Sequence, residues 1–258
     1  MTSAPNSDSI NSKSIYFASD FHLGLDLHES SADREKRIVQ WLSEIIDNTE
    51  ELYLLGDLFD FWFEYKAVVP RGHIRFLAKL AEFTDRGIPV YVFTGNHDMW
   101  IFDYLENEIG VTIHRDPIVN TFGGKTFFLG HGDGLGPGDH GYKLIKKVFR
   151  SKINQWLFAR LHPNFAIWLM RRFSQTSRES QSEDNQFLGA DKEWLVQYCE
   201  KKIQQQNIDY FIFGHRHLPI DHLLSNGQSR YINSGDWMHH NSYVEFCNGK
   251  LELKTYTS

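Results

Sequence analysis

Five short motifs, each following an apolar or β-rich stretch, constrain this 258-residue chain more than any other feature. In chain order they read Asp20-Phe21-His22, Gly56-Asp57, Gly95-Asn96-His97-Asp98, Gly130-His131-Gly132 and Gly214-His215-Arg216-His217. Functional groups of an α/β sheet gather at the carboxyl ends of its strands, so we expect these motifs to meet at one sheet edge. A lone Asp-x-His or Gly-Asp is common by chance, and Asn-His-Asp and Gly-His-x-His are moderately specific. All five in this order indicate a metal site.

The side chains in these motifs are donors for two cations. The carboxylate of Asp57 can bridge both ions. Asp20, His22 and His217 would complete the shell of one ion, and Asn96, His131 and His215 that of the other. Two ions about 3.5–4 Å apart clamp a phosphoryl group and generate hydroxide near neutral pH. The mixed oxygen and nitrogen donors suit Mn, Fe or Zn better than Ca, so we expect two divalent transition-metal ions.

Other polar residues of the motifs are candidates for supporting roles. His97 can donate to the leaving oxygen or to the phosphoryl oxygens, or it only orients Asn96. Asp98 either holds the imidazole of His97 or structures its loop, and Asp133 is expected to support His131. The other histidines are predicted to be mostly surface or structural residues: His28, His73, His114, His140, His162, His222, His239 and His240.

The apolar patterns predict an α/β fold. Buried or alternating runs predict strands at 14–19, 52–55, 89–94, 126–129 and 209–213. Helical spacing predicts helices at 32–48, 73–86 and 191–206. The tail from 230 to 256 alternates like antiparallel strands. Alternating strands and helices imply sheets that are covered by helices.

The segment from about 139 to 187 interrupts this pattern between two ligand motifs. Its apolar spacing predicts two or three amphipathic helices, with Pro163 near the start of one. Nine Lys or Arg and no Asp or Glu lie between Gly141 and Arg178, whereas the rest of the chain holds 18 basic and 33 acidic residues. We expect an insertion that closes over the site and meets an anionic ligand or an anionic membrane surface. Its apolar face either packs on the core or lies at an interface.

Composition excludes several other classes. No apolar run reaches transmembrane length, and residues 1–13 are expected to form a disordered leader without the apolar core of a secretion signal. Two distant cysteines, Cys199 and Cys247, are expected to stay reduced in a cytosolic compartment. The net charge of -6 disfavours nucleic acid as a partner. The oligomeric state stays open.

These motifs resemble those of the calcineurin-like metallophosphoesterases from Ile15 to about Tyr256. Five blocks also resemble the UDP-2,3-diacylglucosamine hydrolases of lipid A synthesis. They are Gly-Asp-Leu-Phe-x-x-Trp at 56–62, His-Gly-Asp at 131–133 with Asp-x-Gly-Tyr at 139–142, Met-Arg-x-x-Ser at 170–174, Gly-His-Arg-His-Leu-Pro at 214–219 and Gly-Asp-Trp at 235–237.

The resemblance implies a metallophosphoesterase sandwich, in which two β-sheets lie between helices and a helical insertion caps the site. It implies that the seven donors above bind metal, typically manganese, and that Asn96 and His215 also meet the substrate. Asp139, Ser174 and Arg178 would contact its nucleotide or diphosphate. That family cleaves the diphosphate of UDP-2,3-diacylglucosamine to UMP and 2,3-diacylglucosamine 1-phosphate, at the cytoplasmic face of the inner membrane.

The chain departs from that family at His97, where well-known members carry Arg. An imidazole and a guanidinium are not equivalent for binding phosphate. An alternative substrate is therefore another nucleotide diphosphate, a phosphodiester or a phosphomonoester. A metal-free interaction scaffold is a further alternative, but such a scaffold would be expected to lose ligands that this chain retains.

Overall fold

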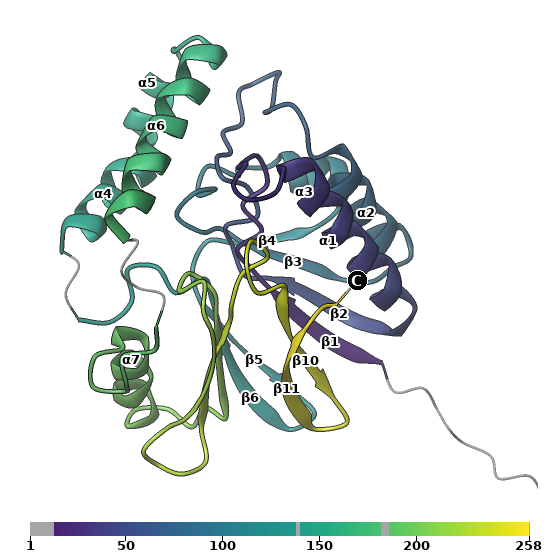
Figure 1. Ribbon diagram of the computed structural model, residues 1–258, viewed down its shortest axis with the longest axis vertical. Coiled ribbons are helices and arrows are strands. Elements are labelled where there is room, and N and C mark those ends of the chain that lie inside the picture. The colour runs from purple at the N-terminus through teal and green to yellow at the C-terminus, as the bar shows by residue number, and fades with distance from the viewer. Residues whose placement is uncertain (1–12, 138–139, 182–185, 258) are drawn as a thin grey trace, which may run out of the picture.

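The computed structural model describes residues 13–137, 140–181 and 186–257, and two mixed β-sheets lie at its centre (Figure 1). The first sheet has the order β11-β10-β1-β2-β3-β4. Strands β1 to β4 are parallel, and β10 and β11 extend the sheet as an antiparallel pair. Their bounds are β1 (Ser14–Ala18), β2 (Thr49–Leu54), β3 (Val90–Phe93), β4 (Thr112–His114), β10 (Ser242–Cys247) and β11 (Lys250–Thr255).

The second sheet has the order β5-β6-β7-β9-β8. Its inner strands β6, β7 and β9 are parallel, and β5 and β8 are antiparallel edges. The bounds are β5 (Ile118–Phe122), β6 (Lys125–Leu129), β7 (Tyr210–Phe213), β8 (Pro219–Leu223) and β9 (Arg230–Ser234). The inner parallel strands β3 and β7 are wholly apolar and β1 is nearly so, as expected for strands that are covered on both faces.

An aromatic layer joins the two sheets. Phe17 on β1 is fully buried, and its ring stacks on Tyr53 of the same sheet and on Phe127 of the other sheet, with centroids 5.2 and 6.0 Å apart. Aliphatic residues from both sheets complete this layer: Ile15, Leu55, Leu129, Ile212, Ile232 and Val244. The layer fixes how the sheets face each other and therefore how their strand ends meet.

Helices cover the outer faces of both sheets (Figure 1). Helices α1 (Ser31–Ile45), followed by a 3₁₀ turn (Ile46–Asn48), α2 (Ile74–Asp85) and α3 (Tyr104–Ile109) pack on the first sheet, and α7 (Trp194–Ile203) packs on the second. Helix α1 begins where the Ser30 hydroxyl accepts the N–H of Asp33 at 3.1 Å, a typical N-cap. Helix α2 ends at Gly87, whose φ of 74° matches the left-handed turn that closes many helices.

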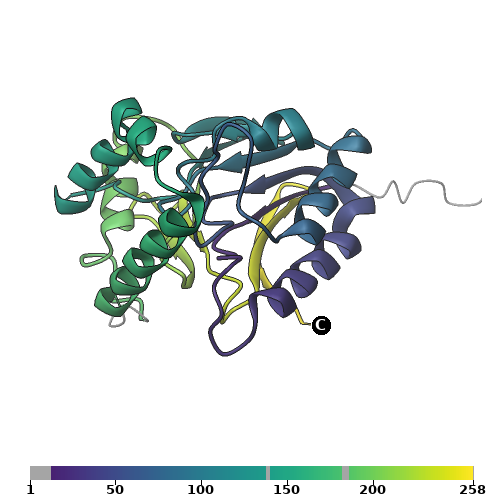
Figure 2. The ribbon, with the colours of Figure 1, turned by 90° about the horizontal axis from the view of Figure 1, so that it is seen from above.

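The segment predicted as an insertion forms α4 (His140–Arg150), α5 (Lys152–Phe158) and α6 (Pro163–Gln181). These helices stand beside the sheets in both ribbon views (Figures 1 and 2). They contact the rest of the molecule through Trp100, whose indole N–H donates to the carbonyl of Phe149 at 2.8 Å. The apolar cluster at this contact contains Phe61, Phe63, Trp100, Phe149, Phe158, Ile167 and Met170.

The structure confirms the α/β fold class and each predicted strand and helix. It adds the six-residue helix α3 and the edge strands β4, β5 and β8, each of which buries a single residue and so has no clear apolar pattern. The antiparallel strands predicted for the tail are present, since β9 pairs antiparallel with β8, and β10 with β11, but β9 lies in the second sheet and also pairs parallel with β7. Cys199 and Cys247 form no disulfide. Residues 1–12 of the expected leader lie outside the described residues.

Replacement of Phe17 by Ala should lower the free energy of unfolding by about 3–5 kcal/mol, because it opens a cavity between the sheets. Chemical denaturation monitored by circular dichroism measures this change. Val119 on β5 is 53% exposed, and its replacement by Ala should cost less than about 0.5 kcal/mol. Equal effects of the two substitutions would contradict a shared inter-sheet core.

Candidate metal centre

The predicted ligands lie in loops at the carboxyl ends of five strands. Asp20 and His22 follow β1, Asp57 follows β2 and Asn96 follows β3 in the first sheet. In the second sheet, His131 follows β6, and His215 and His217 follow β7. The packing of the sheets brings all seven side chains to one place.

The backbone of these loops is strained where the ligands sit. Among the described residues, eight other than glycine have a positive φ, and five of them are predicted ligands: Asp20, His22, Asp57, His215 and His217. Such conformations cost about 1–3 kcal/mol each and persist only where the surrounding structure imposes them, commonly at functional sites. The strain therefore points to this edge as the functional site.

Two glycines allow the loops to approach the carboxylates. A Cβ atom at Gly95 would collide with the carboxylate of Asp57, and one at Gly214 would collide with that of Asp20. A side chain at either position would push these carboxylates out of the cluster. Close packing against acidic side chains therefore explains why Gly95 opens the third motif and Gly214 opens the fifth.

One group of donors surrounds Asp20. Asp20 Oδ1 lies 3.1 Å from His217 Nε2 and 3.8 Å from His22 Nε2, and the two imidazole nitrogens lie 3.2 Å apart. One ligand atom from each of Asp20, His22, Asp57 and His217 can be chosen so that all lie within 4.8 Å of one another. This is the arrangement expected around a single ion.

A second group shares Asp57 with the first. Asp57 Oδ2 lies 3.7 Å from His22 Nε2 and 3.3 Å from His131 Nε2, so this oxygen faces both groups. His131 Nε2 also lies 3.1 Å from Asn96 Oδ1, and the rings of His131 and His215 are 5.1 Å apart. The structure thus brings together both predicted sets, with Asp57 between them.

The carboxylates of Asp20 and Asp57 each use one oxygen to hold a loop. Asp20 Oδ2 accepts the N–H of His215 at 2.9 Å, and Asp57 Oδ1 accepts that of His97 at 2.8 Å. Their other oxygens are buried and accept no well-aligned hydrogen bond from any described residue. A buried carboxylate oxygen without a donor is costly, and a cation would satisfy both. The donors present therefore fit a pair of divalent ions.

The pKa values of the clustered carboxylates and imidazoles show that the site attracts positive charge. Burial alone would raise the pKa of Asp57, but the nearby histidines, His131 foremost, hold it well below its usual range. Burial alone would lower the pKa of His131, but the carboxylates, chiefly Asp57, raise it to about 10. His22 behaves alike, since Asp20 and Asp60 overcome its burial and raise its pKa to about 10. Without metal, the carboxylates thus attract protons to the imidazoles.

Asp60 belongs to the site, although the sequence did not single it out. It is 5% exposed, and its Oδ1 lies 3.7 Å from Nδ1 of both His22 and His97. Its backbone carbonyl lies 3.1 Å from Nδ1 of His97, which fixes that ring. The sequence offered one indication of this role, because Asp60 is a second carboxylate only three residues after the predicted ligand Asp57.

The supporting roles considered for two aspartates are now resolved. Asp98 structures its loop, because its carboxylate accepts the N–H groups of Leu58 and Gly95, both at 2.7 Å. Burial and the nearby Asp57 raise the pKa of Asp98 to about 7. Asp133 acts on His131 through its charge and is not its hydrogen-bond partner. The carbonyl of Leu55 lies 2.8 Å from His131 Nδ1 instead.

Asp133 binds the insertion. Its carboxylate accepts the hydroxyl of Tyr142 and the ammonium of Lys146, both on α4. The sequence did not predict these contacts, because proximity to His131 along the chain does not reveal a contact with a later helix. Among the expected substrate contacts, Asp139 lies outside the described residues, and Ser174 and Arg178 fall on α6, where their side chains are not described.

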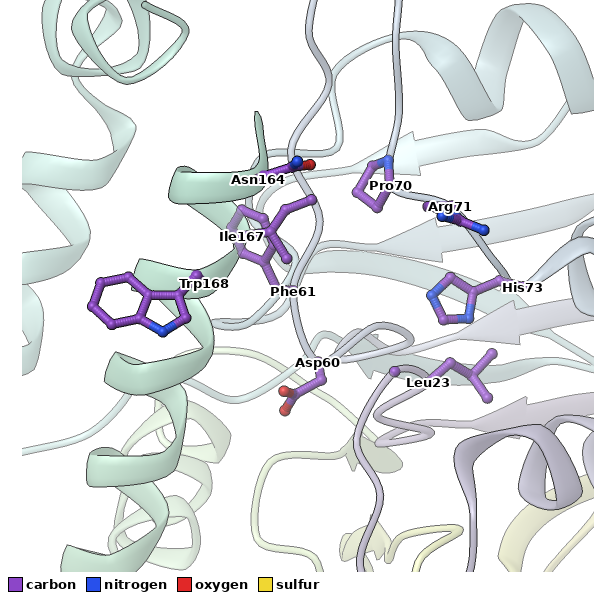
Figure 3. Close-up of a pocket in the computed structure, with 10 residues that line it drawn as sticks. Leu23, Asp60, Phe61, Pro70, Arg71, His73, Asn164, Ile167 and Trp168 are labelled. Atoms are coloured by element: carbon purple, nitrogen blue, oxygen red, sulfur yellow. The ribbon is translucent and has the colours of Figure 1, made fainter. Parts of the chain in front are cut away.

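A pocket of about 350 Å³ adjoins the cluster (Figure 3). Asp60 lies at its base, which links the pocket to His22 and His97. Figure 3 shows α6 along one wall and the loop before α2 along the other. The lining residues are Leu23, Gly24, Asp60, Phe61, Pro70, Arg71, His73, Asn164, Ile167 and Trp168. Leu23, Phe61, Pro70, Ile167 and Trp168 supply apolar surface, and Asp60, Arg71, His73 and Asn164 supply polar groups. Such a lining suits a molecule with a charged end and an apolar end.

Comparisons with known proteins agree with this geometry. The profile of the calcineurin-like phosphoesterases matches residues 13–219. A UDP-2,3-diacylglucosamine hydrolase of Porphyromonas gingivalis is 36% identical over 254 residues, covering 93% of this chain and 97% of that protein. A UDP-2,3-diacylglucosamine hydrolase of Aeromonas salmonicida is 29% identical over 249 residues, covering 95% of this chain and 94% of that protein.

The match spans the clustered donors and most of both sheets. The chain therefore belongs to the calcineurin-like phosphoesterase family of metal-dependent hydrolases, in the group of proteins that are named UDP-2,3-diacylglucosamine hydrolases.

Proposed function

We propose that this chain hydrolyses the diphosphate of UDP-2,3-diacylglucosamine and releases UMP and 2,3-diacylglucosamine 1-phosphate. The observation that carries the proposal is the pocket with an apolar wall that opens beside the cluster of metal-type donors. The full-length likeness to hydrolases of this substrate supports it. A substrate with a diphosphate and two acyl chains needs both features.

Two divalent ions would be held around Asp57. Asp20, His22 and His217 would complete the shell of one, and Asn96, His131 and His215 that of the other. Bound ions of this kind neutralise phosphoryl oxygens and lower the pKa of water to near 7, which supplies the attacking group. Mn suits the mixed donor set and is our first choice, with Fe or Zn as alternatives.

His97 and Asn96 would stabilise the charge that develops on the phosphoryl group. The His97 N–H is held by Asp57, and its Nδ1 faces the carbonyl of Asp60. Since a carbonyl oxygen can only accept, Nδ1 carries the proton of the neutral ring, and Nε2 would donate to a phosphoryl oxygen only when the ring holds a second proton. Burial lowers the pKa of His97, whereas the negative charge of a bound diphosphate would favour the protonated ring, so His97 would act as a donor in the substrate complex.

The insertion would bind the acyl chains and the nucleotide. Helix α6 lines the pocket through Asn164, Ile167 and Trp168. As an insertion at about 139–187, the three helices would cap the site. Asp139, Ser174 and Arg178 are proposed to contact the nucleotide or the diphosphate, with Asn96 and His215 at the cleaved phosphate.

Another nucleotide diphosphate, a phosphodiester or a phosphomonoester is the alternative substrate. The specific observation in its favour is His97, which replaces the Arg of well-known UDP-2,3-diacylglucosamine hydrolases. An imidazole offers one donor to phosphate, where a guanidinium offers a fork of several.

A peripheral contact with an anionic membrane would deliver the acylated substrate at the cytoplasmic face. Among the described residues, no helix has the length and apolarity needed to span a bilayer. Ile153, Trp156 and Trp168 on the insertion are instead 72%, 57% and 53% exposed. The guanidinium of Arg160 lies over the Trp156 ring at 4.6 Å. Exposed aromatic residues among basic ones are typical of an interfacial surface.

A comparison of three substrates tests the reaction. With Mn²⁺ present, kcat/KM should be highest for UDP-2,3-diacylglucosamine and at least about a hundredfold lower for UDP-N-acetylglucosamine, because burying acyl chains contributes about 0.8 kcal/mol per CH₂. p-Nitrophenyl phosphate should be slower still. Equal values for all three would exclude an acylated substrate, and a preference for the phosphomonoester would support the alternative.

Replacement of His97 by Ala should lower kcat by about 10²–10³-fold, the usual cost of one donor to a developing oxyanion. Binding of Mn²⁺ should stay unchanged, because His97 is not among the proposed ligands. Steady-state kinetics and a Mn²⁺ titration measure the two effects. His222→Ala on β8 is the control and should keep wild-type kinetics. Loss of metal binding together with kcat would show that His97 only supports a ligand.

Replacement of both Ile153 and Trp156 by Glu should lower binding to vesicles that contain phosphatidylglycerol by about tenfold or more, because burying each apolar side chain stabilises by about 1.5–3 kcal/mol. Vesicle sedimentation measures the bound fraction. Ile74→Glu on α2 is a matched control, since Ile74 is 75% exposed but lies outside the insertion. If the double variant binds vesicles as the wild type does, the insertion is not the membrane contact.

A further inference from the structure

The loop of the fifth motif would supply one ligand to each of the two ions. The His215 ring lies 5.1 Å from that of His131, and His217 Nε2 lies 3.1 Å from Asp20 Oδ1. Both histidines of the loop have a positive φ, 70° and 52°, which residues other than glycine adopt mainly where the surroundings impose it. A single short loop must therefore be held firmly if both imidazoles are to reach their ions.

Arg216, which stands between these two ligands, forms a buried ion pair with Glu193. Its Nε donates to Glu193 Oε1 at 2.7 Å, and its Nη2 donates to Oε2 at 3.2 Å. The two side chains are 7% and 2% exposed. Because the guanidinium is planar and binds both carboxylate oxygens, the pair fixes the orientation of Arg216 as well as its position.

Glu193 lies at the start of α7, but its side chain does not cap that helix. It precedes the first residue of α7 and makes no hydrogen bond to the N–H groups of the first turn. Its carboxylate binds Arg216 instead. Helix α7 is anchored on the second sheet by buried apolar residues, among them Leu195 and Val196. The pair thus ties the ligand loop to a helix that is fixed to the core.

The start of α7 also meets both ligand loops of the second sheet directly. The ring of Trp194 lies 5.7 Å from that of His215, in an edge-on arrangement with an interplanar angle of 75°. In the loop that follows β6, a Cβ atom at Gly136 would lie 2.7 Å from the carbonyl of Trp194, and one at Gly132 would lie 3.3 Å from Leu195 Cδ1. The helix therefore packs closely against the loops that carry His131 and His215.

We propose that Glu193 and Arg216 are positioning residues, which hold the loop so that His215 and His217 each reach one ion. The inference rests on the proposed metal centre, and neither residue is among its ligands. Glu193 also neutralises the Arg216 cation, which would otherwise repel two divalent ions nearby. Partners behind a metal ligand commonly change metal affinity by about 10–100-fold. Because one loop serves both ions, loss of the pair should weaken both.

A titration of metal-stripped protein with Mn²⁺ tests this, with free Mn²⁺ followed by electron paramagnetic resonance. The wild type should bind two ions. Arg216→Lys keeps the charge but loses the fork, and it should weaken both ions by about 10–100-fold. Arg230→Lys is the matched control and should bind as the wild type does. Its guanidinium forms a similar fork with Asp221, with Nε 2.9 Å from Oδ1, but at the amino end of β9.

A double variant separates positioning from stability. Replacement of a whole buried ion pair by apolar residues of similar volume is often neutral for stability, whereas removal of one partner is destabilising. Glu193→Leu combined with Arg216→Met should therefore unfold near the wild-type temperature when both proteins are metal-free, as measured by circular dichroism. It should still bind both ions about 10–100-fold more weakly, because the directional contact is gone.

Each outcome supports or overturns the inference. Wild-type affinities in Arg216→Lys would overturn it and leave the metal centre standing, and weakening of one ion alone would exclude a shared role. A double variant with wild-type stability and wild-type affinities would show that the pair only stabilises the fold. If the double variant does not fold, Arg216→Lys and Arg230→Lys decide, at a temperature where both are folded. A wild type that binds fewer than two ions would overturn the proposed centre together with this inference.

Discussion

The site depends on the different roles of the two carboxylate oxygens of Asp57. Oδ1 accepts the backbone N–H of His97 and so fixes the loop after β3. Oδ2 is buried, lacks a well-aligned donor among the described residues, and faces His22 on one side and His131 on the other. Oδ1 thus holds the loop that carries Asn96 and His97, and Oδ2 is placed to bind cations. A carboxylate in this position is expensive unless positive charge compensates it.

The fold delivers the donors to Asp57 by packing two sheets on one aromatic layer. His22 and Asp57 come from the first sheet, and His131 and His217 from the second. No single strand pair could bring these side chains together. Phe17, Tyr53 and Phe127 therefore affect the metal centre indirectly, because they set the distance and angle between the sheets.

The sequence predicted the parts of the site that have a local signature. Asp20, Asn96 and His215 each follow a short apolar strand, and the rule that ligands gather at strand ends was enough to place them. Asp60 escaped prediction because its contacts are with His22 and His97, which are distant in sequence. Asp133 was assigned to His131 for its proximity along the chain, whereas it binds α4. The edge strands β4 and β8 were missed because each buries only one residue, which leaves no apolar run or alternation to detect.

The most direct test of the central claim is anomalous diffraction from crystals grown with Mn²⁺. The account predicts two peaks about 3.5–4 Å apart, both in contact with Asp57, one beside His22 and His217 and the other beside His131 and His215. Crystals of Asp57→Asn should lose at least one peak. A single peak away from Asp57, or no peak in the wild type, would contradict the account.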